Sequence, residues 1–531
     1  MRRAAAVLAA VVGLALPAVA HASVAHDATL ARRGITLGLR HHWLKPPDAQ
    51  RYRADVTRAV RDASTLAPLR ARVIASQLSQ MTPLWSSYVS PRALSLFTQL
   101  EANTSYLETH RLPTTQIDIA DDDGVVYRWF PGLGFEFHPL ANFGALNGDA
   151  ASGDADATQT LADALVARAI PRGNRLIWEY QFRVGSARPP WASGMAQAVA
   201  AQSLARSAAL LEDPMLGADA VRAFASVPAL TLSLPNGPWI RLYGFDHEIV
   251  LNAQLQTILS LLEYSKQTND TAASTLAQRL DATAQALFKR FDTGDWSLYE
   301  LGGGYAKLSY QQFVTSLLQK LAAQTQDPFW VAAAQQFHAY TYDPPSVTTT
   351  LTGPQTIWPQ PLDGYLDVAQ IPLTLNMRAS VTLAVGGRIS TYRFTPGAHT
   401  ITWKPPAGLA PGTYPVQVSA VSYAGHRGTV TLPPIVVQAD TTPPVAGPVT
   451  FDGTTLNWQF TDAGTPWLDL VVAFTDPSGV NPPQTIDLGH LATSGQAPVA
   501  VPPGTWQATL TATNSAGLST PVLLGTFTGA G

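Results

Sequence analysis

The sequence has no cysteine among its 531 residues, which excludes a disulfide framework and every form of thiol chemistry. Charged residues are also scarce, at 13% of the chain, and the formal net charge is only −3. A chain without a basic excess has little attraction for nucleic acid or an anionic membrane, so we expect neither as a partner. Because 46% of the residues are hydrophobic, the chain is nevertheless globular rather than disordered.

Familiar catalytic and metal-binding motifs are missing too. The chain contains no G-x-S-x-G elbow, no H-E-x-x-H helix and no glycine-rich loop that could cradle a phosphate. His41-His42 and the aspartate run at 121–123 could touch a metal, but a solvated pair and a turn are the simpler interpretation. We therefore expect neither a metal nor a cofactor.

The first two dozen residues have the three parts of a secretory signal. Arg2 and Arg3 provide positive charge, an apolar run follows from Ala4 to Leu16, and small residues suited to cleavage come next. A run of about 13 apolar residues is too short to span a bilayer. We expect residues 1–22 to be a signal peptide and the mature protein to be secreted, extracellular or periplasmic, without a membrane span.

Most of the chain up to residue 343 has apolar residues at helical spacing. One clean stripe follows the spacing i, i+4, i+7, i+8 and i+11, and it consists of Leu251, Leu255, Ile258, Leu259 and Leu262. Frequent helices joined by short connectors predict antiparallel pairs. We expect residues 25–343 to form a mainly α, (α/α)-barrel-like domain. Alternating residues around the turn at 121–123 predict a projecting β-hairpin insertion at about 117–147.

After Pro344-Pro345 the helical stripes end and short alternating segments rich in Thr, Val, Pro and Gly begin. One pattern occurs twice: a P-G-T-aromatic turn, three alternating apolar positions and an Ala-Gly turn, first from Pro411 and again from Pro503. Such a repeat predicts two all-β immunoglobulin-like or fibronectin-like sandwiches, at 346–438 and 445–529. The predicted architecture is therefore multidomain. Spacers or glycan-adhesion modules are the functions we expect for the two sandwiches.

Several segments of the helical part resemble, in order, the D-glucuronyl C5-epimerases of heparan-type polysaccharide synthesis. Trp191–Gln197 resembles the family's W-x-S-A-M-A-Q, and Phe137–Gly144 resembles its Y-x-P-x-Q-x-x-x-Y-G. Val250–Asn252 matches V-L-N, and Asp292–Leu301 resembles D-T-G…I-Y-D-L. Tyr310 stands where the family has Y-H-x-x-H. The resemblance extends roughly from residue 127 to residue 340.

The resemblance implies an isomerase that inverts C5 of uronate residues in a polysaccharide, which would be its partner. Such a reaction removes the C5 proton with a base and returns one from the other face, while a cation neutralises the carboxylate. Phenols can serve on both faces if a cation lowers one pKa. By position, the catalytic residues would be Tyr243, Tyr299 and Tyr310, converging on one cleft. The substrate-binding candidates are Arg241, Trp191, Gln197, Trp239, Arg183 and Lys307.

The sequence also departs from the family pattern. The family's W-Y-E-E-Y-P loop reads Trp-Ile-Arg-Leu-Tyr-Gly at 239–244, so the tyrosine remains but both carboxylates are gone. The family's arginine after the second tyrosine is replaced within Gly302-Gly303. Positive charge could come instead from Arg241, Arg183 or Lys307. A base could come from Asp246, His247 or Glu248.

Besides a C5-epimerase, two other classes of function stay open: another carbohydrate-active enzyme on the same scaffold and a non-catalytic protein. An enzyme is favoured. A polysaccharide lyase would share the C5 proton abstraction and then expel the O4 substituent. A glycoside hydrolase would need two facing carboxylates, for which Glu179, Asp246 and Glu248 are the nearest candidates. The third possibility is a non-catalytic glycan-binding protein on the same helical scaffold.

Overall fold

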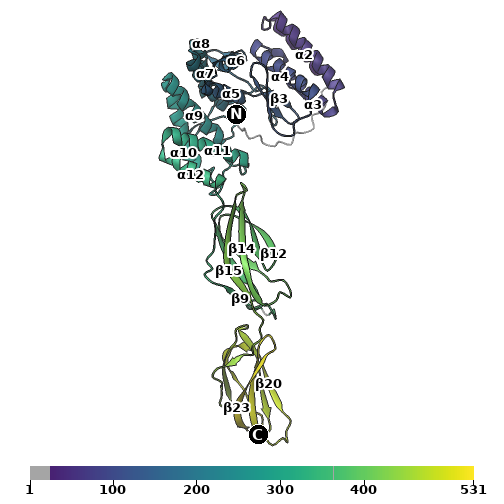
Figure 1. Ribbon diagram of the computed structural model, residues 1–531, viewed down its shortest axis with the longest axis vertical. Helices are drawn as coiled ribbons and strands as arrows, with labels where there is room; N and C mark the ends of the chain where they lie inside the picture. The colour runs from purple at the N-terminus through teal and green to yellow at the C-terminus, as the bar shows by residue number, and fades with distance from the viewer. Residues whose placement is uncertain (1–23, 363, 531) are drawn as a thin grey trace. The chain divides into compact units, whose positions relative to one another are not determined.

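The computed structural model of the protein describes residues 24–362 and 364–530, and the chain divides into two compact units. One unit is helical and extends to Thr341, and the other begins at Tyr342 and is built of strands (Figure 1). The predicted signal peptide at 1–22 lies outside the described residues. None of the helices in the described ranges has both the length and the apolar character needed to cross a membrane.

Helices dominate the first unit, and many begin at a proline or behind a capping side chain. Asp213 caps α8 and Asp270 caps α10, because each side chain accepts hydrogen bonds from the first free N–H groups of its helix. The helices are α1 (Val24–Arg40), α2 (Pro46–Thr65), α3 (Pro68–Met81), α4 (Ser90–Thr109), α5 (Pro139–Ser152), α6 (Ala155–Val166), α7 (Gly194–Leu211), α8 (Pro214–Phe224), α9 (Leu251–Thr268), α10 (Thr271–Phe288), α11 (Leu308–Thr325) and α12 (Pro328–Tyr342).

Two helices, α7 and α9, are buried on most of their surface and organise the second half of this unit. Helix α7 packs against α5, α8 and α9, and α9 packs in addition against α10 and α11. The alanine-rich sequence of α7 allows this close packing, since the residues from Gly194 to Ala205 are all buried. The predicted stripe on α9 is largely confirmed, because Leu251, Leu255 and Ile258 are fully buried. The N-termini of α7 and α9 carry the loops described below.

The predicted hairpin insertion at 117–147 is a different structure. Three short antiparallel strands, β1 (Asp118–Ala120), β2 (Val126–Phe130) and β3 (Gly134–Phe137), form one sheet. Helix α5 already begins at Pro139. The sheet does not project from the helices, because large side chains of β2 and β3 are buried and β3 packs against α3 and α4. The predicted turn at 121–123 is confirmed. The third strand and the burial of the sheet depend on tertiary packing, which the local sequence pattern does not show.

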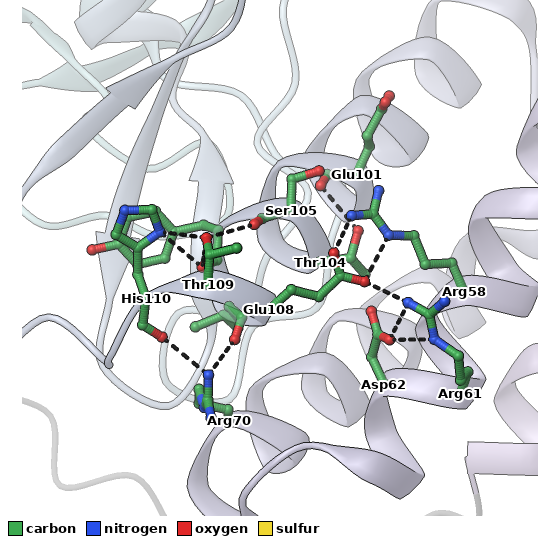
Figure 2. A network of polar contacts seen from close by, with 12 residues as sticks. Arg58, Arg61, Asp62, Arg70, Glu101, Thr104, Ser105, Glu108, Thr109 and His110 are labelled. Atoms are coloured by element: carbon green, nitrogen blue, oxygen red, sulfur yellow. Dashed lines mark hydrogen bonds and ion pairs between the residues drawn. The ribbon is translucent and has the colours of Figure 1, made fainter.

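A polar network joins α2 and α3 to α4 (Figure 2). Arg58 and Arg61 of α2 both donate to the carboxylate of Glu108, and Arg61 also pairs with the buried Asp62. Arg70 of α3 donates from Nη1 to the backbone oxygen of Leu107 at 2.8 Å. Single surface ion pairs contribute little, but a shared carboxylate orders several side chains at once.

The second unit contains two separate apolar cores. The first lies between the sheets β13-β10-β8 and β12-β11-β14-β15-β9, and the second between β16-β18-β17 with β21 on β18 and the sheet β20-β19-β22-β23. The strands are β8 (Val347–Thr348), β9 (Gln355–Ile357), β10 (Ala369–Leu375), β11 (Ala379–Val385), β12 (Arg388–Phe394), β13 (Gly397–Trp403), β14 (Gly412–Ser422), β15 (Arg427–Val437), β16 (Val445–Ala446), β17 (Thr450–Phe451), β18 (Thr455–Thr461), β19 (Trp467–Thr475), β20 (Gln484–Ala492), β21 (Ser494–Pro498), β22 (Gly504–Thr513) and β23 (Ser519–Gly529).

The repeated sequence pattern falls on equivalent strands of the two cores. Strand β14 pairs with β11 and β15, and β22 pairs with β19 and β23, so each copy is an inner strand of its sheet. In both strands every second side chain is buried, from Val416 to Ala420 and from Trp506 to Ala512. The alternation in the sequence therefore corresponds to one face of each sheet packed against a core.

Candidate active site

The loop that carries the first predicted tyrosine runs from Arg241 to Val250, between β7 (Gly237–Ile240) and α9. Its start is fastened to the N-terminus of α7 by two backbone hydrogen bonds. The N–H of Gly194 donates to the Arg241 oxygen at 2.9 Å, and the N–H of Gly244 donates to the Ala192 oxygen at 2.8 Å. A Cβ on Gly244 would lie 2.7 Å from that same oxygen, so glycine is required for this close approach.

The segment between α10 and α11 lies beside the end of this loop. Val250 and Glu300 form an antiparallel bridge, and the N–H of Leu301 donates to the oxygen of Ile249 at 3.1 Å. The two loops are thus held together by backbone contacts. Tyr299 and Glu300 are thereby brought next to residues that precede α9 by only a few positions.

The three predicted tyrosines come together. Tyr299 and Tyr310 meet edge to face with 4.8 Å between ring centroids, and the side chains of Tyr243 and Tyr299 shift each other's pKa values. Trp191 contacts Tyr243, with 5.5 Å between the ring centroids. The Tyr310 hydroxyl is buried, donates to the Tyr299 oxygen at 3.0 Å and accepts from the N–H of Asn252 at 3.2 Å. Tyr310 therefore braces the two loops, whereas Tyr243 and Tyr299 are partly exposed.

The environment of these phenols does not favour their ionisation. Burial, together with the nearby carboxylates of Glu248, Asp246 and Glu300, raises the pKa of Tyr243 to about 12. Burial also raises the pKa values of Tyr299 and Tyr310 strongly. The interaction of the two side chains lowers the pKa of Tyr243 and raises that of Tyr299. All three phenols are neutral near pH 7, which suits proton donation rather than abstraction.

Glu248, a carboxyl group in the same loop as Tyr243, can ionise near neutral pH, unlike the phenols. Partial burial of the carboxyl group, together with the charges of Asp246 and Glu300, raises the pKa of Glu248 to about 7. Glu248 is exposed, so a ligand can reach it. It also raises the pKa of both Tyr243 and Tyr299 by its charge, which places it in their electrostatic surroundings. A group with a pKa near 7 is well matched to general base catalysis at neutral pH.

Two of the predicted substrate-binding residues are buried structural groups instead. Gln197 is 0% exposed, and its amide accepts from the N–H of Trp178 and donates to the oxygen of the same residue. Trp239 is also 0% exposed and stacks on Phe291 with 5.7 Å between centroids. Neither side chain can meet a ligand. The Gln197 amide instead holds the backbone at Trp178, which precedes α7.

The predicted cations differ in their surroundings. Arg241 donates from Nη1 to the backbone oxygen of Asp246 at 2.8 Å, within the loop that carries Tyr243 and Glu248. Arg183 and Lys307 are exposed, and neither side chain makes a hydrogen bond or an ion pair with another described residue. Arg241 is therefore the predicted cation with a defined place beside the tyrosines.

Glu179, one of the carboxylates considered for hydrolysis, is held as a counter-ion. Arg92 contacts both of its oxygens at 3.0 and 3.1 Å, and Arg172 donates to it at 2.8 Å. The side chain of Glu179 is 2% exposed. Because Glu179 is buried and its oxygens are already held by two guanidinium groups, they are not free to act on a glycosidic bond as hydrolysis would require. In the described part of the chain, no group of three or more His, Asp or Glu side chains is arranged to hold a metal ion.

The helical unit thus places neutral phenols beside a carboxyl group in two neighbouring loops. Residues 172–339 match the family described as D-glucuronyl C5-epimerase C-terminus. The match covers less than half of the chain, and within it the resemblance predicted from the motifs is confirmed. The motif at 137–144 lies outside the matched residues. The match indicates a carbohydrate-modifying, epimerase-like protein.

Several solved structures are similar to parts of the chain. Cellobiose 2-epimerase from Bacillus thermoamylovorans B4167 is 10% identical, with a TM-score of 0.34, over 52% of this chain and 75% of the other. Endo-β-1,4-glucanase CMCax from Acetobacter xylinum is 14% identical, with a TM-score of 0.30, over 46% and 76%. The fibronectin(III)-like modules of CbhA from Clostridium thermocellum are 14% identical, with a TM-score of 0.17, over 35% and 94%. No curated protein matches the chain.

Proposed function

We propose that the helical unit inverts C5 of uronate residues within a polysaccharide, with Glu248 as the base and Tyr243 as the proton donor. The observation that carries this proposal is the pairing of a carboxyl group whose pKa is about 7 with a phenol whose pKa is about 12. Two groups with such different pKa values, close together, can divide the roles of base and acid at neutral pH. The family match at 172–339 supports the same reaction class.

In the first step the Glu248 carboxylate takes the C5 proton, and the electron pair of the C–H bond moves into the sugar carboxylate. Arg241 keeps its charge at any working pH and has further N–H groups free to hold that carboxylate, which carries the added charge. In the second step Tyr243 gives its hydroxyl proton to C5 from the other face. The neighbouring Tyr299 side chain lowers the pKa of Tyr243 and so stabilises the resulting phenolate, which then recovers a proton through water from Glu248.

The test is incubation of heparosan with the full chain in deuterated water, followed by NMR of the C5 position. The proposal expects deuterium at C5 and no cleavage of the polysaccharide. New ultraviolet absorbance from an unsaturated uronate would identify a lyase, because the same carbanion would have expelled the O4 substituent. Binding of the polysaccharide without exchange or cleavage would favour a glycan-binding protein and contradict the proposed reaction.

We also propose that the protein acts outside the cytoplasm after removal of residues 1–22. The motive is the tripartite N-terminal pattern. N-terminal sequencing of the mature protein should then begin near Ser23, and an intact Met1 on the folded protein would contradict export.

The architecture supports a division of labour between the two units. We propose an (α/α)-barrel-like arrangement for the helical unit, which would hold the reaction site, and immunoglobulin-like modules as spacers or adhesion modules for the strand unit. A chain truncated near Asp343 should then retain C5 exchange on soluble heparosan, because the site residues all precede α12. Loss of exchange in a folded truncation would show that the modules take part in catalysis.

A further inference from the structure

A second polar feature of the helical unit lies next to the tyrosines and is not used by the reaction proposed above. It is a pocket of about 300 Å³, and the residues of its lining that matter here are Arg172, Arg175, Glu179, Trp191, Gly244 and Phe245. We call it the arginine pocket. Its volume is at the small end of the range for ligand pockets, about 300–1,000 Å³, which suits a sugar unit rather than a macromolecular surface.

The arginine pocket has an excess of positive charge. Arg172 and Arg175 face each other as the register partners of a two-stranded hairpin, β4 (Ile170–Arg172) and β5 (Arg175–Ile177). Like charges directly opposite each other on neighbouring strands destabilise a sheet. Glu179 offsets only part of this charge, because Arg92 already contacts both of its oxygens.

Arg175 is the cation that this arrangement leaves uncompensated. Arg172 donates to Glu179 at 2.8 Å, whereas the Arg175 guanidinium has no hydrogen bond or ion pair with any described residue. Two guanidinium groups thus contact the Glu179 carboxylate, and a third, that of Arg175, lines the same pocket. A guanidinium presents parallel N–H donors that match the two oxygens of a second carboxylate. The pocket therefore has the charge and the donors to bind an anionic group.

Two aromatic side chains, Trp191 and Phe245, line the arginine pocket, and Trp191 also contacts Tyr243. Phe245 is 39% exposed and meets Trp191 edge to face, with 5.6 Å between centroids. The opposite neighbour in the loop, Tyr243, contacts the same Trp191 ring at 5.5 Å. Gly244 lies between them and lines the pocket. An aromatic rim beside a cation suits an acidic sugar, whose ring has apolar faces and whose carboxylate is charged.

We propose that the arginine pocket is a subsite for the carboxylate of a second uronate residue, close along the same polysaccharide to the residue that reacts. Arg175 is its principal ligand and Arg172 its second. The proposal rests on the proposed function for the identity of the polymer, and it narrows the substrate class to chains that carry uronates repeatedly. A single uronate or a neutral polysaccharide would leave the charge of the pocket uncompensated.

The test measures binding by calorimetry with the full chain and a heparosan hexasaccharide, compared with the same hexasaccharide after reduction of its carboxyl groups. The wild type should bind the acidic form at least about tenfold more tightly, the value of one charge-assisted hydrogen bond. Arg175→Ala should lose about tenfold in affinity for the acidic form and little for the reduced form. Arg175→Lys should lie between the two, since it keeps the charge but not the paired donors.

Arg188→Ala is the matched control, because Arg188 is an exposed arginine of the neighbouring loop that does not line the pocket. Its affinity should equal that of the wild type. Arg175 is the variant of choice because it has no internal partner whose loss could disturb folding. A thermal melt equal to that of the wild type verifies this.

Wild-type affinity in Arg175→Ala, or equal affinity of the wild type for the two hexasaccharides, would overturn the subsite. Absence of wild-type binding would overturn it as well. The two proposals fail separately. If Arg175→Ala loses the preference for the acidic hexasaccharide but neither the wild type nor any variant shows C5 exchange, the result supports the subsite alone. Normal exchange with unchanged affinity in Arg175→Ala supports the reaction alone.

Discussion

Replacing Glu248 with glutamine is expected to lower the rate of C5 exchange by a factor of about 10²–10⁴, the usual contribution of a general base. Glutamine keeps the shape of the side chain but cannot take a proton. Binding of heparosan should change little, because Glu248 acts on the C5 hydrogen and not on the sugar carboxylate. Exchange measured by NMR, with affinity measured separately, distinguishes these effects.

The pH dependence of the wild type gives an independent readout. Only the ionised form of Glu248 can accept the proton, so the exchange rate should rise with pH and reach half its plateau near pH 7, where its pKa lies. The plateau should continue to high pH, because the donor Tyr243 has a pKa of about 12. A rate that is flat between pH 5 and 9 would contradict the assignment, as would wild-type exchange in Glu248→Gln.

Glu300→Gln is the matched variant for this experiment. Glu300 raises the pKa of Glu248 by its charge, so its neutralisation should move the midpoint of the pH profile to lower pH. The plateau rate should stay close to that of the wild type, because Glu300 is not required to move a proton. A loss of exchange without a shift in midpoint would indicate that Glu300, rather than Glu248, is the base.

The second large effect concerns stability and comes from Glu136 in the sheet β1-β2-β3. This side chain is 0% exposed, and its Oε1 accepts hydrogen bonds from Gln77 at 2.7 Å and Gln80 at 2.9 Å. Its Oε2 is buried without a partner. Burial raises the pKa of Glu136 from 4.5 to about 8, so the carboxyl group is neutral in the folded protein near pH 7.

Between pH 4.5 and about 8 the folded state therefore holds a proton that the unfolded state has released. The contribution of Glu136 to the free energy of unfolding should be highest below pH 4.5. It should fall as the pH rises to about 8, by a few kcal/mol in all. Thermal unfolding followed by far-ultraviolet circular dichroism measures this loss for the helical unit.

Glu136→Gln should remove most of that pH dependence, since glutamine still accepts the two hydrogen bonds but cannot ionise. The same change at Glu212, which is exposed at the end of α7, should leave the dependence unaltered. A parallel decline of melting temperature with pH in the wild type and in Glu136→Gln would show that other groups cause it.

Within the site, the residue types predicted from the sequence were more reliable than the roles assigned to them. The resemblance brought Tyr243, Tyr299 and Tyr310 together, and the structure also joins them. Cation activation of a phenol was expected, yet burial and three carboxylates raise the phenol pKa values. The loop lacks the family's carboxylates at 241–242, and Glu248 is one of three bases that the sequence offers in their place. Only the burial and the charges around it distinguish Glu248 from the other two.

The sequence by itself determined the local features of this protein. Proline and aspartate mark where α8 and α10 begin, the stripe on α9 marks its buried face, and the alternation in β14 and β22 marks one buried face of each sheet. The end of the helical periodicity near Pro344 lies within a few residues of the division after Thr341. These features depend on contacts between residues close in the chain, or on which residues avoid water, and both leave a periodic signal.

Only the tertiary structure decided which side chains reach solvent and which charges lie together. Gln197 and Trp239 have the residue types of a binding site but are enclosed by packing from distant segments. Strand register makes Arg172 and Arg175 face each other, and partial burial with the charges of Asp246 and Glu300 sets the pKa of Glu248 near 7. Burial and electrostatic potential depend on all neighbours in space, and the order of residues along a single chain does not record them.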